Sequence, residues 1–174
     1  IANKFKFKNE KFYSKNIFFN TLNDTNSVSI CIRQNRFSEK LRKINSTDRK
    51  ESDNYSIEQI NYVQKSIKFI KSKISNPKFY IWSNDFNNLE KYFPENKFTH
   101  IKNSDSLSEG RKPLLDLFLM TQAKHFIVTP SSFNWWGAYL SKNLNKIIIR
   151  PDEKNFSKFK VNNLDFWPEN WIKI

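Results

Sequence analysis

The chain has 174 residues, enough for one domain with a hydrophobic core, and its 38% hydrophobic and 16% aromatic content argues against intrinsic disorder. No apolar run approaches the roughly 20 residues of a transmembrane helix, and the first residues lack the apolar stretch of a signal peptide. The net charge of +13 comes from 24 Lys and 6 Arg spread along the chain beside 23 Asn, a compositional bias that argues against a nucleic-acid partner.

The first segment is basic. Its densest cluster, Lys4 to Lys15, alternates lysines with Phe and Tyr, so it is either a solvated face or a contact with a polyanion or an anionic membrane surface. Peripheral membrane contact is therefore one expectation. The chain does not begin with Met, and we expect a fragment in which residues 1–26 are the remnant of a preceding segment.

Residues 27–32, Ser-Val-Ser-Ile-Cys-Ile, predict a buried strand. The polar and charged residues 33–55 predict a long loop. A helix is expected over residues 56–74, because Ser56 and Gln59 form a capping-box pattern at its start. One face of this helix is expected to be apolar, formed by Ile57, Ile60, Val63, Ile67, Ile70 and Ile74.

The middle of the chain continues the alternation. Residues 79–83 predict a strand, 87–92 a short helix and 97–101 a weaker strand. Pro113 stands in the first turn of an apolar helix that ends at Ala123.

The last elements follow the same order. Residues 125–129 predict a strand, Ser131 or Ser132 caps a helix, and residues 146–150 predict a final strand. Strands that alternate with helices indicate an α/β fold with a Rossmann-like parallel sheet flanked by helices. We expect one domain over residues 1–174, with its core at 27–151 and a tail, 152–174, that packs back.

Polar side chains follow four of these strands. In parallel sheets the carboxyl ends of the strands form one edge, where ligands bind. The residues at these ends are Arg33, Asn84, Asp85, Ser131, Ser132 and Arg150.

The turn before the helix at Ser132 is the strongest candidate, because a helix N-terminus offers free N–H groups to a phosphate; the alternative is a simple N-cap. Arg33 either clamps a diphosphate or forms a loop salt bridge. Asp85 either faces a ligand or closes an Asx turn. Asp116 either meets a polar partner or complements the helix dipole.

Metal and cofactor chemistry is not expected. Two histidines, His100 and His125, and one cysteine, Cys31, are too few for a zinc site by themselves. The sequence has no Walker loop and no G-x-G-x-x-G motif. The single Cys31 also excludes an internal disulfide; it is expected in the core and is typical of a reducing, cytoplasmic compartment.

Residues 114–151, "LLDLFLMTQAKHFIVTPSSFNWWGAYLSKNLNKIIIRP", resemble the C-terminal signature of the α-1,2-fucosyltransferases of glycosyltransferase family 11. That signature reads D-x-x-x-M, then S-S-F-S-W-W-x-A-x-L, then K-x-x-x-x-P. "FYIWSNDF" is similar to the family's F-S-D-D segment, and "SICIRQNRF" occupies the place of its H-x-R-R-x-D motif.

The resemblance implies the donor-binding half of a GT-B-like glycosyltransferase. It implies transfer of L-fucose from GDP-fucose to a galactose-type hydroxyl in an α-1,2 linkage, with inversion and without a catalytic metal, in surface-glycan or O-antigen synthesis. The expected partners are a nucleotide sugar and a glycan acceptor; one alternative is that this acceptor is linked to a lipid. The expected location is the bacterial cytoplasm at the inner face of the membrane.

The matching positions imply the site residues. Arg33 would bind the β-phosphate, Ser131 or Ser132 the diphosphate and Asp116 the guanine, while Asp85 would lie near the nucleotide. Trp135, Trp136 and Gly137 would form a scaffold for the phosphate turn; direct sugar contact is the alternative for the tryptophans.

This chain departs from the motif at three positions, where Cys31, Gln34 and Arg36 replace the family's His, second Arg and Asp. Arg36 would supply replacement charge, and Glu39 is the candidate catalytic base. Two other functions are weighed beside the transferase: a basic nucleic-acid-binding module, and a tryptophan-dependent carbohydrate-binding module without catalysis.

Overall fold

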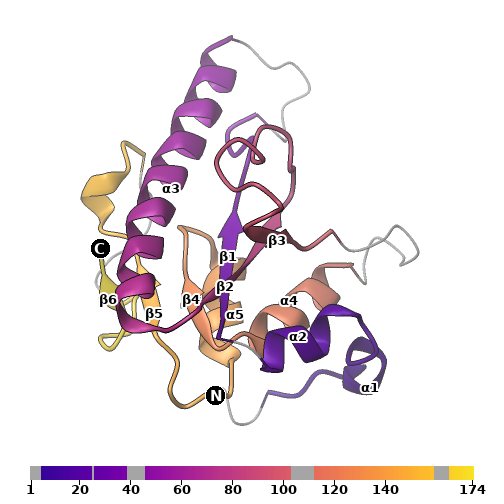
Figure 1. Ribbon diagram of the computed structural model, residues 1–174. Helices are drawn as coiled ribbons and strands as arrows, with labels where there is room; N and C mark the ends of the chain where they lie inside the picture. The colour runs from indigo at the N-terminus through magenta and orange to yellow at the C-terminus, as the bar shows by residue number, and fades with distance from the viewer. Residues whose placement is uncertain (1–4, 25, 39–45, 103–111, 159–164) are drawn as a thin grey trace.

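The computed structural model of the chain describes residues 5–24, 26–38, 46–102, 112–158 and 165–174 (Figure 1). Six parallel strands form one sheet in the order β3-β2-β1-β4-β5-β6. The strands are β1 Ser27–Ile32, β2 Lys78–Ser83, β3 Phe98–His100, β4 His125–Ile127, β5 Ile148–Arg150 and β6 Ile172–Lys173. The helices are α1 Glu10–Tyr13, α2 Phe18–Asp24, α3 Ser46–Lys73, α4 Lys112–Gln122, α5 Ser132–Leu140 and the 3₁₀ helix η2 Glu153–Asn155.

Helices cover both faces of the sheet (Figure 1). Side chains alternate between the faces along each strand: Val28 and Ile30 of β1 pack in the cluster that contains α3, whereas Tyr80 and Trp82 of β2 pack in the cluster that contains α4. Burial on both faces explains why the central strands consist mainly of apolar residues with small buried serines, Ser27 and Ser29, in β1. The expected Rossmann-like α/β class with a parallel sheet is confirmed.

The start of α3 differs from expectation. Residues 46–55 belong to the helix rather than to a loop, so the capping box at Ser56 is wrong. Ser56 is inside the helix and donates its hydroxyl to the carbonyl of Ser52 at 2.9 Å. Ser52 and Tyr55 are one turn apart and both are buried, so polar residues occupy the packed face here. Ile57, expected on the apolar face, is 42% exposed.

The short helix expected over residues 87–92 is also wrong. This stretch consists of turns, and Asn88 adopts the left-handed conformation with φ 63°, which interrupts a helix. Four short elements were not expected: α1, α2, η2 and β6. The strand β6 has two residues, too few to show a pattern, and it pairs with β5 next to buried Trp171.

The basic first segment is partly core. α1 and α2 pack against α4, where Phe7, Tyr13 and Phe19 all contact the ring of Phe118. Phe12 points away from the core and is 52% exposed. Among the residues that the structure describes, no helix combines the length and the apolar character that a bilayer crossing requires.

Gly137 sets the distance between α4 and α5. A Cβ atom at this position would lie 3.0 Å from Met120 Cβ and 3.1 Å from Met120 Sδ. Because Met120 Cβ is fixed to the backbone of α4, a side chain at residue 137 would push the helices apart.

We predict that Gly137→Ala destabilises the protein by up to about 2 kcal/mol, because an overpacking cost of about 1–3 kcal/mol outweighs a gain of about 1 kcal/mol in helix propensity. Denaturant unfolding measures the change. An Ala variant as stable as the parent would show that α4 and α5 can separate at no cost.

Candidate functional site

A pocket of about 320 Å³ opens at the carboxyl ends of β1, β2 and β4. Five chemically distinct side chains line it: Cys31, Arg33, Trp82, Asp116 and Ser131. Lys112 adds a second cation to the wall. The sequence predicts that polar groups after the strands converge on one edge of the sheet. Arg33, Asn84 and Ser131 do so, since all three line this pocket.

Arg33 is held through its backbone. Its N–H donates to Gln59 Oε1 at 3.1 Å, and Gln59 Nε2 donates back to the Arg33 carbonyl at 2.8 Å. Gln59 lies on α3 and is 1% exposed. Two opposed hydrogen bonds in a buried place fix the peptide, so the guanidinium extends from a rigid base.

The turn after β4 is pinned at three points. Thr129 donates its hydroxyl to the carbonyl of Cys31 at 2.6 Å, which ties the turn to β1. The buried Asn134 donates to Thr129 Oγ1 at 3.4 Å from inside α5. Tyr55 of α3 donates to the carbonyl of Pro130 at 3.4 Å. The turn is therefore fixed to strand, helix and opposite layer at once.

Ser131 is the N-cap residue of α5, but its side chain makes no capping hydrogen bond. The first N–H groups of a helix have no partner within the helix. Since Ser131 lines the pocket, its hydroxyl and the helix N-terminus together offer donors and a positive dipole end to an anion.

Ser132 belongs to a neighbouring hollow, which Trp135, Trp136, Asp165 and Phe166 also line. Trp135 is half-buried, donates from Nε1 to the Phe166 carbonyl at 2.8 Å and packs against Trp171. Trp136 is 41% exposed. The packing of α5 against the tail thus runs through the first tryptophan, while the second faces solvent.

Cys31 and Asp116 lie close enough to interact across the pocket. Burial, followed by the negative charge of Asp116, raises the pKa of the Cys31 thiol to about 12 against the opposing positive charge of Arg33. Asp116 and Arg33 therefore both act on the same small volume, one as an acceptor and the other as a cation.

Asp85 and its neighbours close a loop instead of lining the pocket. The Asp85 carboxylate accepts from the N–H of Asn87 at 2.8 Å, an Asx turn, and from Asn35 Nδ2 at 3.2 Å. Gln34 Nε2 donates to the carbonyls of Asp85 and Asn87 at 2.7 and 2.9 Å. The amide that replaces the motif's second arginine thus joins the loops after β1 and β2.

Two other candidate residues, Arg36 and Arg150, lie away from this pocket. Arg36 is exposed, and its charge acts on Tyr55 on the α3 side. Arg150 ends β5 but places its guanidinium over the ring of Trp167, 5.8 Å from the centroid. Glu39 falls outside the described residues.

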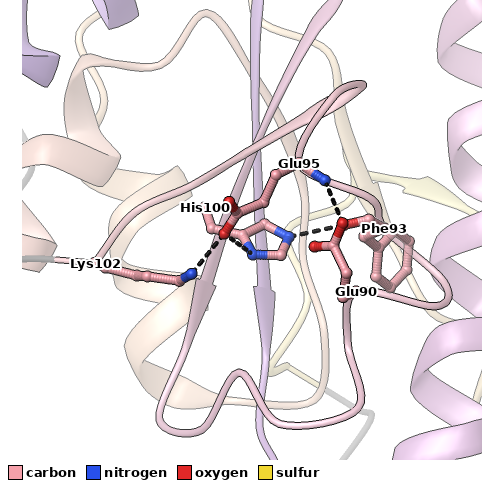
Figure 2. A network of polar contacts seen from close by, with 5 residues as sticks. All are labelled: Glu90, Phe93, Glu95, His100 and Lys102. Carbon is pink, nitrogen blue, oxygen red and sulfur yellow. Dashed lines mark hydrogen bonds and ion pairs between the residues drawn. The ribbon is translucent and has the colours of Figure 1, made fainter.

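One group of described side chains could hold a cation: Glu90, Glu95 and His100 place their ligand atoms within 4.8 Å of one another. Figure 2 shows the network that occupies them. His100 Nε2 bonds to the Phe93 carbonyl at 2.8 Å, and Lys102 bonds to the Glu95 carboxylate that His100 Nδ1 also approaches at 3.2 Å. The Lys102 ammonium already supplies a positive charge, so the cluster secures the loop before β3.

Sequence reasoning missed Gln59 and Trp82 as parts of the site. The sequence pattern predicts a capping role for Gln59 and a strand position for Trp82, and neither prediction indicates a site. Trp82 could have been found from the strand register. Cys31 and Trp82 pair across β1 and β2, so both lie near the carboxyl edge of the sheet and on the same face.

The chain is similar in sequence to known glycosyltransferases. Residues 10–174 match the family described as Glycosyl transferase family 11. An "Alpha-1,2-colitosyltransferase" from Escherichia coli is 30% identical over 150 residues, which is 86% of this chain and 48% of that protein. An "O-antigen biosynthesis glycosyltransferase WbnK" from Escherichia coli is 27% identical over 115 residues, 66% of this chain and 36% of that protein. The chain thus spans about half or less of these relatives, and no solved structure is significantly similar to it.

We predict that the Cys31 thiol reacts very slowly at neutral pH. A rise in pKa from 9.0 to about 12 cuts the reactive thiolate about 1,000-fold at pH 7.5, and the alkylation rate should keep rising with pH until about 12. Iodoacetamide labelling is unambiguous because the chain has one cysteine. Asp116→Asn should speed the reaction at fixed pH, and a rate plateau near pH 9 would contradict the assigned environment.

We also predict that Gln59→Leu weakens anion binding at the pocket by roughly tenfold, because the Arg33 peptide loses both buried partners. Calorimetry with a nucleoside diphosphate measures this. Gln64→Leu, at an exposed position of the same helix, is the matched control and should bind as the parent does.

Proposed function

The chain belongs to glycosyl transferase family 11, and from this premise we propose that its pocket binds the nucleoside diphosphate of a nucleotide-sugar donor. The observation that supports this most directly is the convergence of Arg33, Ser131 and the α5 N-terminus on one pocket. A guanidinium opposite a helix N-terminus complements two phosphates. Asp116, in the same wall, is the proposed guanine partner.

We infer that the reaction is the inverting transfer of L-fucose from GDP-fucose to a galactose-type hydroxyl, giving an α-1,2 linkage. The acceptor oxygen forms its bond to the anomeric carbon as the bond to the β-phosphate oxygen breaks, and GDP leaves with the electron pair. Arg33 and the α5 amides would stabilise the charge that develops on this oxygen. Glu39 stays the predicted base that takes the acceptor proton.

The chain is proposed to be the donor-binding half of the enzyme. Its pocket contains groups suited to a nucleotide, and the chain spans 48% of the colitosyltransferase relative. Because that relative is named for colitose, a colitose donor is the second candidate beside GDP-fucose. The glycan acceptor, in a lipid-linked or free form, would also contact the other half of the enzyme.

Surface-glycan synthesis at the inner face of a bacterial membrane is the proposed setting. The relative named for O-antigen biosynthesis supports the pathway class. Exposed Phe12 and Ile17 beside Lys11 and Lys15 support a peripheral membrane contact, since apolar and basic groups together favour an anionic bilayer surface.

The test is nucleotide binding by the chain and turnover by the intact enzyme. GDP should raise the melting temperature more than UDP or ADP. Arg33→Ala should weaken GDP binding and lower turnover by roughly 10²–10³-fold, as expected when one preorganised donor to a developing anion is lost. Arg49→Ala, which removes an exposed cation from α3, is the matched control and should leave binding unchanged.

Each competing function gives a different result. A nucleic-acid-binding module would bind DNA or RNA with steep salt dependence and no nucleotide preference. A carbohydrate-binding module would bind free glycans in the absence of GDP. Normal GDP binding and turnover by the Arg33→Ala variant would contradict the assigned role of the guanidinium.

A further inference from the structure

Trp82 lines the pocket and carries a buried donor without a partner in the described part of the chain. Trp82 lies near the end of β2, is 3% exposed and borders the pocket. Its indole N–H is buried and has no hydrogen-bond partner among the described residues. A buried donor without an acceptor costs free energy on folding, and a hydrogen bond to a ligand oxygen would recover it.

Asp116 places an acceptor on the same side of the pocket. Cys31 pairs with Trp82 across β1 and β2, and the charge of Asp116 acts on the thiol of Cys31. Trp82 and Asp116 both line the pocket. An N–H donor and a carboxylate acceptor therefore border one volume near the end of β2.

The sheet order separates this volume from the phosphate turn. β2 and β4 lie on opposite sides of β1, and adjacent strands are about 4.8 Å apart, so about 10 Å separate them. A nucleoside holds its base and its phosphates at opposite ends. With a diphosphate at Ser131 and Arg33, the base falls towards Trp82 and Asp116.

The two side chains match one kind of base edge. Guanine presents the O6 acceptor beside the N1–H and N2 amino donors, whereas adenine presents an amino donor at position 6. A carboxylate can accept from the two adjacent donors of guanine, and an indole N–H can donate to O6.

We propose that Trp82 is a specificity-determining residue whose indole N–H donates a hydrogen bond to the 6-oxo oxygen of the purine in the bound nucleotide. This inference rests on the proposed function, because it assumes that the pocket holds a nucleoside diphosphate. Trp82 would thus recognise the group at position 6 of the base, while the carboxylate of Asp116 would recognise the neighbouring N1–H and N2 amino donors.

The experiment pairs one substitution with one atom of the ligand. GDP and 6-thio-GDP differ at position 6, where sulfur is a weak acceptor, and they share the N1–H and N2 amino donors. The chain should bind GDP about threefold to tenfold more tightly than 6-thio-GDP. Trp82→Phe should remove this preference by weakening GDP alone. Trp171→Phe, another buried tryptophan outside the pocket, should keep it.

A second measurement needs no substitution. The chain contains 5 Trp, so a ¹⁵N spectrum should show one indole signal that moves downfield with GDP and stays in place with 6-thio-GDP. Equal affinity of the parent chain for both nucleotides, or an equal loss of both in Trp82→Phe, would overturn this inference and leave the proposed function standing. Absence of any GDP binding by the parent chain would overturn both.

Discussion

The site depends on buried polar side chains of α3 that bond to the backbone at the carboxyl ends of the strands. Gln59 fixes the Arg33 peptide, Tyr55 bonds to the Pro130 carbonyl, and Tyr62 donates within 3.1 Å of the carbonyls of both Val128 and Ile149. The Arg33 peptide and the carbonyls of Val128 and Pro130 lie where a strand turns into a loop, whereas the Ile149 carbonyl lies within β5 and also accepts from the Val128 N–H at 2.8 Å. The helix therefore satisfies groups that would otherwise need water, and in doing so it sets the relative positions of the arginine and the turn.

This arrangement also explains why the pocket can combine charge with rigidity. Loops at a sheet edge are usually its most mobile part. Here the turn at 129–131 is bonded to β1 and α5 as well as to α3. Preorganised donors stabilise a developing charge without first having to be ordered, which is the property that a leaving diphosphate requires.

Local patterns were sufficient for the fold class. The apolar runs at 27–32 and 79–83 could be identified as strands because burial on both faces leaves little alternation, and Pro113 marked the first turn of α4. The first turns of α3 were not predictable, since Ser52 is buried by contact with Ser38 and with the N–H of Phe37, 14 and 15 positions earlier in the sequence. A buried polar residue such as Ser52 does not contribute to an apolar periodicity. The apolar pattern of α3 is therefore missing in the first turns, where polar residues make the tertiary contacts.

The same limit applies to the site. The order of strands and turns predicted which residues end near one edge, and Arg33, Asn84 and Ser131 do line the pocket. Side-chain direction was not encoded in that order: Asp85 turns back into its own loop, and Arg150 lies against Trp167. Gln59 and Trp82 act through contacts between segments distant in sequence, which a single chain read locally cannot reveal.

The sheet ends in very short strands on both sides. β3 has three residues and β6 has two, so each flank exposes few unpaired amide and carbonyl groups. Strand-by-strand self-association of folded molecules is accordingly disfavoured at both margins. A further domain would pack against the loops and helices of this one rather than add strands to its sheet. The carboxyl edge of the sheet would then be free to face that domain.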